Sequence, residues 1–106
     1  MQIRLLIFKG CPSGPKAEQV LKEVLEEEGI KDPIEIIDVP DMETAIREHF
    51  LGSPTIQING RDIEESRQHD APCYGCRIYR TPEGDSGVPP KELIRSAIRK
   101  ASDGNN

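Results

Sequence analysis

The feature that most constrains the fold is an alternation of short apolar segments with segments of helical periodicity. Residues 3–8 form a short segment that is rich enough in apolar side chains for a buried strand. Across residues 17–25 the apolar side chains recur at helical spacing, with Pro15 near the start and Gly29 after the end. Residues 34–39 give a second strand. The N-terminal part therefore predicts a right-handed unit of two parallel strands joined by a helix.

The next segment predicts a second helix and then a hairpin. Asp41 can cap this helix, and Gly52 would end it. Helical spacing assigns its inner face to Met42, Ala45, Ile46 and Phe50. Residues 55–59 alternate as a strand does, and Asn59-Gly60 is the strongest hairpin signal in the chain. The returning strand is either Asp62–Ile63 or residues 77–80, and the sequence leaves both open.

A final helix is expected from the spacing of Leu93, Ile94, Ala97, Ile98 and Ala101. The expected order is β-α-β-α-β-β-α, which predicts an α/β fold. Its sheet is mixed and four-stranded, with helices on both faces. We expect one domain over residues 1–101 and a flexible tail over 102–106.

Charge and hydropathy narrow the function classes. The chain has 106 residues and a net charge of -5, whereas general nucleic-acid binders and proteins that dock on anionic lipid carry basic patches. Its longest apolar run, Leu5–Phe8, is far shorter than the ~20 residues that span a bilayer. It is also shorter than the apolar region of a signal peptide. We therefore expect a soluble, cytoplasmic monomer that binds neither nucleic acid nor membranes.

The three cysteines are the main chemical clue. A structural disulfide framework is not expected in a chain without an export signal, so these residues need another role. Cys11 stands between the first strand and the first helix. There, unpaired backbone N–H groups and the helix dipole favour a thiolate, and Lys9 adds a positive charge. The alternative is a small buried cysteine that packs at the end of a strand.

The second clue is Ser53-Pro54-Thr55, directly before the third strand. Proline cannot donate to a β-ladder, so it suits the start of a strand. A cis bond before Pro54 would expose the backbone of Ser53 to an incoming extended peptide, whereas ordinary turn chemistry is the alternative.

Together, Gly10-Cys11-Pro12 and Ser53-Pro54-Thr55 resemble the thioredoxin-like superfamily, and residues 54–60 are similar to the third strand and turn of its glutaredoxin-sized members. The resemblance implies that Cys11 is the attacking thiol and that Pro54 is cis and packs beside it. We further expect a substrate-binding surface at Pro12, Ser53, Pro54 and Thr55. The chain departs from the family motif Cys-x-x-Cys because Gly14 holds the second position. Cys11 would therefore act as a monothiol or with a resolving thiol from elsewhere.

Cys73-Tyr74-Gly75-Cys76 is the third clue. It lies in a long connection that could fold over the Cys11 end of the sheet. In a redox interpretation, one of its thiols attacks a mixed disulfide on Cys11, or the two form their own disulfide. In a metal interpretation, His69, Cys73 and Cys76 supply three ligands and Cys11 a fourth. Simple burial of Cys76 is the third alternative.

The leading hypothesis is a thiol–disulfide oxidoreductase without a cofactor, with Cys11 as nucleophile and Cys73 or Cys76 as resolving thiol. Its partner would be a disulfide-containing protein or a low-molecular-weight thiol. One alternative is a protein that binds zinc, copper or mercury through the same three thiols. The other is a thioredoxin-fold domain that binds a partner without catalysis.

Overall fold

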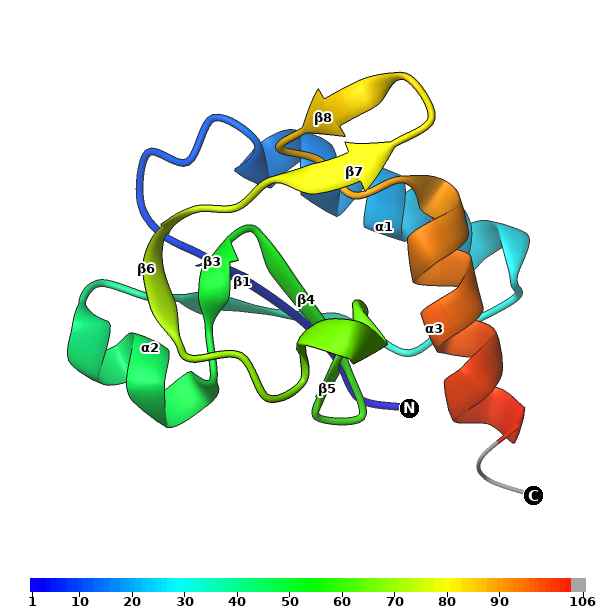
Figure 1. Ribbon diagram of the computed structural model, residues 1–106. Helices are drawn as coiled ribbons and strands as arrows, with labels where there is room; N and C mark the ends of the chain where they lie inside the picture. Colours follow the sequence, from blue (N-terminus) through cyan, green and yellow to red (C-terminus); the bar gives the residue numbers. More distant parts are fainter. Residues whose placement is uncertain (104–106) are drawn as a thin grey trace.

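Strands and helices alternate through the first half of the chain, as the apolar periodicities predict (Figure 1). This computed structural model describes residues 1–103 and has a mixed α/β architecture. The elements in chain order are β1 (Ile3–Ile7), α1 (Gly14–Glu27), β2 (Ile34–Asp38), α2 (Met42–Glu48), β3 (Leu51–Ser53), β4 (Thr55–Ile58), β5 (Arg61–Asp62), the 3-10 turn η1 (Glu65–Arg67), β6 (Cys73–Cys76), β7 (Tyr79–Thr81), β8 (Gly84–Ser86) and α3 (Lys91–Asp103).

The main sheet has four strands in the order β2-β1-β4-β5. β1 pairs in parallel with β2 and antiparallel with β4, with Leu5 opposite Ile56. The turn between β4 and β5 uses Asn59 and Gly60 at φ values of 53° and 80°, as a tight hairpin of this kind requires. β5 therefore answers the question that the sequence left open, because the strand that returns from this turn begins at Arg61.

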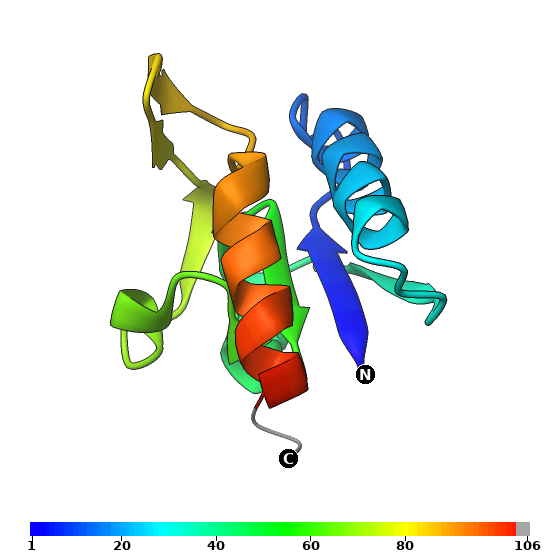
Figure 2. The ribbon, with the colours of Figure 1, turned by 90° about the vertical axis from the view of Figure 1, so that its right-hand side faces the viewer.

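Side chains alternate across this sheet and divide it into two faces. Ile3, Leu5, Ile56 and Ile58 point to the face that α1 and α3 cover (Figure 2). This face carries the larger apolar core, whose buried members are Ile3, Leu5, Ala17, Leu21, Val24, Leu25, Ile56, Ile58, Ile63, Tyr79, Ile94 and Ile98.

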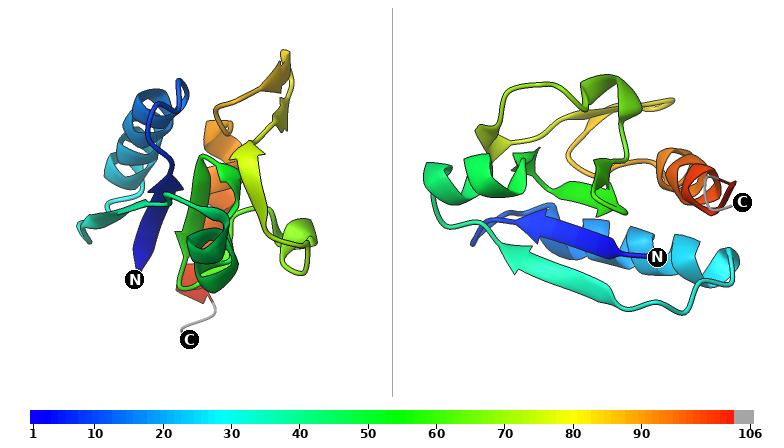
Figure 3. Two further views of the ribbon diagram at one scale, coloured as in Figure 1. Left: turned by 90° about the vertical axis from the view of Figure 1, so that its left-hand side faces the viewer. Right: turned by 90° about the horizontal axis from the view of Figure 1, so that it is seen from below.

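The opposite face is covered by α2 and, beside it, by β6 (Figure 3). Its apolar cluster is small and consists of Leu6, Val39, Ala45 and Phe50. Helices therefore lie on both faces, as predicted.

α2 begins after Asp41, as predicted, but it ends before Gly52, where the sequence predicts its end. Asp41 caps it, since its side-chain oxygen accepts from the Thr44 N–H at 2.8 Å. The helix ends at Glu48 because His49 adopts a left-handed conformation with φ 58°. The predicted inner face was wrong at two positions, since Met42 and Ile46 are 43% and 60% exposed. A helix this short turns only one narrow stripe toward the sheet, and Ala45 occupies it.

Two small ladders lie outside the main sheet. β3 pairs in parallel with β6, and β7 pairs with β8 in a hairpin. The prediction of residues 77–80 as the last strand of the main sheet was wrong. Arg77 and Ile78 lie between the two ladders, and Tyr79 and Arg80 belong to β7. β5 already occupies the edge of the main sheet that such a strand would need.

The final helix, α3, covers every position that the periodicity assigned to it and continues to Asp103. Residues 102 and 103 of the expected tail are thus helical, and residues 104–106 lie outside the described part of the chain.

Candidate functional site

Cys11 lies in the turn between β1 and α1. Its backbone N–H donates to the carbonyl of Phe8 at 3.2 Å, and its carbonyl accepts from the N–H of Gly14 at the same distance. These bonds hold Cys11 beside the first turn of α1, as predicted. The residue is only 8% exposed and is therefore buried.

The segment that follows β8 packs against the same loop. Gly87 lies so close to Ser13 that a Cβ at this position would overlap the serine side chain. The β7–β8 hairpin and its return to α3 thus run past the start of α1 (Figure 1). In the same loop, Lys9 and Gly10 are exposed and Cys11 is buried.

Ser53-Pro54-Thr55 connects β3 to β4, and all three residues are buried. The Ser53–Pro54 peptide bond is cis. The hydroxyl of Ser53 accepts from the N–H of Phe8 at 3.3 Å. Since Phe8 also accepts from the N–H of Cys11, the tripeptide lies next to the turn that carries this thiol.

The prediction that the Ser53 backbone is open to an incoming peptide was wrong. The N–H of Arg77 donates to the carbonyl of Ser53 at 3.0 Å, and Ser53 is 1% exposed. The chain itself occupies this position. Of the four expected substrate-contacting residues, only Pro12 is exposed.

Cys73 and Cys76 begin and end β6, and both are exposed. Cys73 pairs with Leu51, and Cys76 pairs with Ser53. The connection that carries the Cys-x-x-Cys motif therefore does fold over the Cys11 end of the sheet. Cys76 thus pairs with Ser53, whose hydroxyl bonds to Phe8 in the turn that carries Cys11, and all three cysteines are free thiols.

Arg77 is the residue that the sequence analysis missed. Its side chain is fully buried, and its guanidinium donates to both carboxylate oxygens of Asp62 at 2.8 Å. It also donates to Glu64 at 2.8 Å and to the hydroxyl of Thr55 at 3.2 Å. The ion pair with Asp62 fixes the end of β6 to β5, because unpaired buried charges are strongly unfavourable.

A signal for this pair was present in the sequence. Asp62 and Arg77 lie in the two candidate segments for the returning strand, and they carry opposite charges. Two such charges in adjacent candidate strands favour a cross-segment ion pair.

Burial and charge act in opposite directions on the pKa of Arg77. Burial lowers it, but the hydrogen bonds and negative charges of Asp62 and Glu64 raise it by more, so the pKa lies above its ordinary value. The guanidinium also lies over the ring of Tyr79, 4.5 Å from its centroid. Burial raises the pKa of the Tyr79 hydroxyl, which stays neutral and donates to the carbonyl of Pro54 at 2.6 Å.

Tyr74 anchors the other end of β6. Its ring contacts Phe8 edge-on at a centroid distance of 5.5 Å, and Phe50 lies 6.4 Å away. Its hydroxyl donates to the carbonyl of Pro40 at 2.9 Å. β6 is thus held at both ends, with its two thiols exposed.

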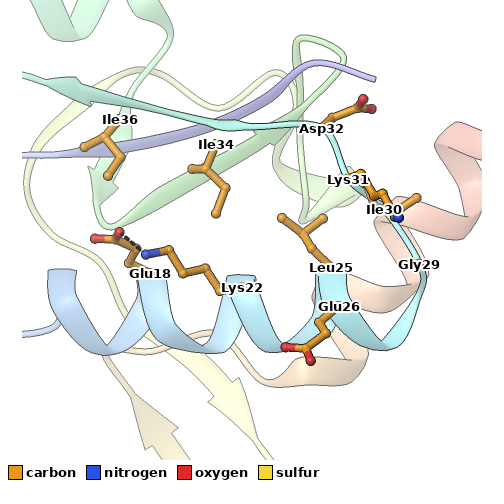
Figure 4. A pocket seen from close by; sticks show the side chains of 10 residues that line it. All are labelled: Glu18, Lys22, Leu25, Glu26, Gly29, Ile30, Lys31, Asp32, Ile34 and Ile36. Atoms are coloured by element: carbon orange, nitrogen blue, oxygen red, sulfur yellow. Dashed lines mark ion pairs between the residues drawn. The ribbon is translucent and has the colours of Figure 1, made fainter.

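Two grooves of the surface lie away from the thiols. One, of about 490 Å³, runs between α1 and β2; Ile34 and Ile36 line it from the strand, and Leu25 and the Glu18–Lys22 ion pair line it from the helix (Figure 4). The other, of about 840 Å³, lies between β5 and α3. None of the described residues that line either groove is a cysteine.

Within residues 1–103, no group of three or more histidine, cysteine, aspartate or glutamate side chains is arranged to hold a metal ion. His69, the third ligand in the metal interpretation, is exposed. In the same described region, none of the helices has the length and apolar character needed to cross a membrane.

Comparison with known proteins places the chain in one family. The family described as a domain of unknown function, DUF2703, matches residues 15–98, and the chain belongs to it. The matched segment includes Cys73 and Cys76 and begins after Cys11. Neither the curated proteins nor the solved structures gave a match.

Proposed function

We propose that this protein is a thiol–disulfide oxidoreductase of thioredoxin-like fold, with Cys11 as nucleophile and Cys76 as resolving thiol. One observation carries the proposal: Ser53 links the two cysteines. It pairs with Cys76 across the β3–β6 ladder, and its hydroxyl bonds to Phe8, which in turn bonds to Cys11.

The arrangement of the main sheet supports the fold assignment. Its order is β2-β1-β4-β5, with a parallel first pair and antiparallel pairs after it. Cys11 stands between β1 and α1, which is where the resemblance assigns the attacking thiol. The N-terminus of a helix favours nearby negative charge, so this position suits a thiolate as it attacks.

The chemistry follows in two exchanges. The Cys11 thiolate attacks one sulfur of a substrate disulfide, forms a mixed disulfide and releases the other sulfur as a thiolate. The Cys76 thiolate then attacks the Cys11 sulfur, and the second half of the substrate leaves as a thiolate. The two protein thiols are oxidised to a Cys11–Cys76 disulfide, and the substrate gains the two electrons. A small thiol in excess restores the reduced protein.

A single-turnover reaction of the fully reduced protein with oxidised glutathione tests this order of events. After an acid quench and alkylation, peptide mass mapping should find a disulfide between Cys11 and Cys76. Cys76→Ser should stop the reaction at a glutathione mixed disulfide on Cys11, and Cys11→Ser should abolish it. Cys73→Ser is the matched control and should react as the wild type does. A Cys11→Ser protein that reacts at the wild-type rate would overturn the proposal.

A further inference from the structure

The outer edge of β3 is covered by the chain itself. The carbonyl of Phe50 accepts from the N–H of Cys73 at 2.9 Å, and the carbonyl of Ser53 accepts from the N–H of Arg77 at 3.0 Å. These are the acceptors that an added strand would use, because an extended peptide binds a sheet edge through free backbone groups. In this protein β6 already uses them.

The two strands also approach each other closely. Gly52 has a φ of +106°, and a Cβ at this position would lie 3.0 Å from the Cβ of Arg77 and 3.2 Å from the carbonyl oxygen of Gly75. A glycine is therefore required in the middle of β3 while β6 stays in place. This close approach leaves no space for a second strand between β3 and β6.

β6 is anchored strongly enough to resist displacement. Moving it aside would separate Arg77 from Asp62, and both side chains are at most 1% exposed. Such a separation leaves two buried charges without partners, which is strongly unfavourable. It would also break the contacts of Tyr74 with Phe8 and with the carbonyl of Pro40.

The thiols themselves have unequal access. Cys76 is exposed, whereas Cys11 is 8% exposed in a loop against which Gly87 packs. A compact disulfide can reach a recessed sulfur without backbone contacts. An extended polypeptide needs an open edge beside that sulfur to hold its disulfide there.

We propose that β6 restricts this protein to small disulfides by occupying the edge of β3 on which an extended peptide would bind. The inference rests on the proposed function and assigns its substrate class. Oxidised glutathione and similar small disulfides react, while disulfides within extended peptide segments react slowly. Arg77 and Asp62 are the positioning residues of this restriction.

The experiment compares two symmetric disulfides in single-turnover reactions of the reduced protein. One is oxidised glutathione, and the other joins two copies of an uncharged peptide of about ten residues, long enough to pair as a strand, so that attack on either sulfur places a peptide at the site. The wild type should reduce the small disulfide at least about tenfold faster, because the peptide finds no free strand edge beside Cys11 and the compact disulfide needs none.

Two variants loosen β6 by different means. Asp62→Asn removes the charge that pairs with Arg77, and Gly52→Ala disturbs the close approach without changing any charge. In both, the rate with the peptide disulfide should rise toward that with oxidised glutathione. Leu21→Ala, in the core beneath α1, is the control for loss of stability alone and should keep the wild-type ratio.

The outcomes separate the two proposals. If oxidised glutathione and the peptide disulfide react with the wild type at equal rates, the restriction to small disulfides is overturned and the proposed activity stands. If the ratio of the two rates is the same in both variants as in the wild type, the role of β6 is overturned and the proposed activity stands. If neither disulfide reacts with the wild type, both the activity and its substrate class are overturned.

Discussion

The two faces of the main sheet are held together in different ways. The face under α1 and α3 is apolar almost throughout, with Leu5 and Ile56 from the sheet against Leu21 and Ile94 from the helices. Burial of this kind is non-directional and scales with the area removed from water. The ion pairs between these helices, such as Glu28 with Arg99, lie near the surface and add little.

The face under α2 and β6 combines a small apolar cluster with buried polar side chains. Arg4 donates to Gln57 at 3.0 Å and to Glu48 at 2.5 Å, and Arg77 is paired with Asp62. Such bonds are directional, so each member specifies where its partner must lie. Apolar burial therefore stabilises one face, and polar pairs determine where irregular segments lie on the other.

The largest expected effect comes from breaking the buried pair on the polar face. Arg77→Leu leaves the buried Asp62 carboxylate without a charged partner and should lower the free energy of unfolding by about 3–5 kcal/mol in urea denaturation. The double variant with Asp62→Leu should recover much of this loss, because no uncompensated buried aspartate remains. A single variant as stable as the wild type would show that the pair does not hold this face.

A truncation on the apolar face sharpens the contrast. Leu21→Ala removes a fully buried side chain and should cost about 2–5 kcal/mol in the free energy of unfolding. The alkylation rate of Cys76 under native conditions should stay the same, because β6 lies on the other face. A marked increase in that rate would mean that the two faces are coupled.

Two glycine substitutions separate backbone strain from contact with β6. Gly52→Ala combines a positive φ with a close approach to Arg77 and should cost about 2–3 kcal/mol. Gly29→Ala has a φ of +69° but no atom nearby, so about 1 kcal/mol is expected. Chemical denaturation of each variant measures the change in the free energy of unfolding. Equal changes in the two variants would argue against close packing of β3 on β6.

The smallest effect concerns acid pH. The hydrogen bond from Arg4 is the largest influence on the pKa of Glu48 and lowers it below its ordinary value of 4.5. Because the pKa is lower in the folded state, the pair stabilises the protein above that ordinary value, and the contribution is lost as the pH falls through the lowered pKa. Glu48→Gln should therefore reduce stability near neutral pH and have little effect in strong acid. Unfolding curves of both proteins across this range provide the measurement, and a constant difference would contradict the assignment.

The first half of the fold was predictable from local pattern. The apolar run of β1, the alternation in β4, the helical spacing in α1 and the Asp41 cap are properties of neighbouring residues, so they are visible without the fold. The inner face of α2 was not, since Met42 and Ile46 satisfy the spacing but the helix ends too early to bury them. Residues 61–88 showed no clear periodicity, and their placement depends on contacts far away in the sequence.

The amino-acid sequence by itself determined the strand–helix alternation, the Asn59-Gly60 turn and the position of Cys11 before a helix. Each follows from interactions within a few residues. Only the tertiary structure decided that β6 pairs with β3 and that Ser53, the partner of Cys76, bonds to Phe8 in the turn that carries Cys11. The physical reason is that an irregular segment goes where its buried charge finds a partner, and Arg77 finds Asp62 at the edge of the sheet.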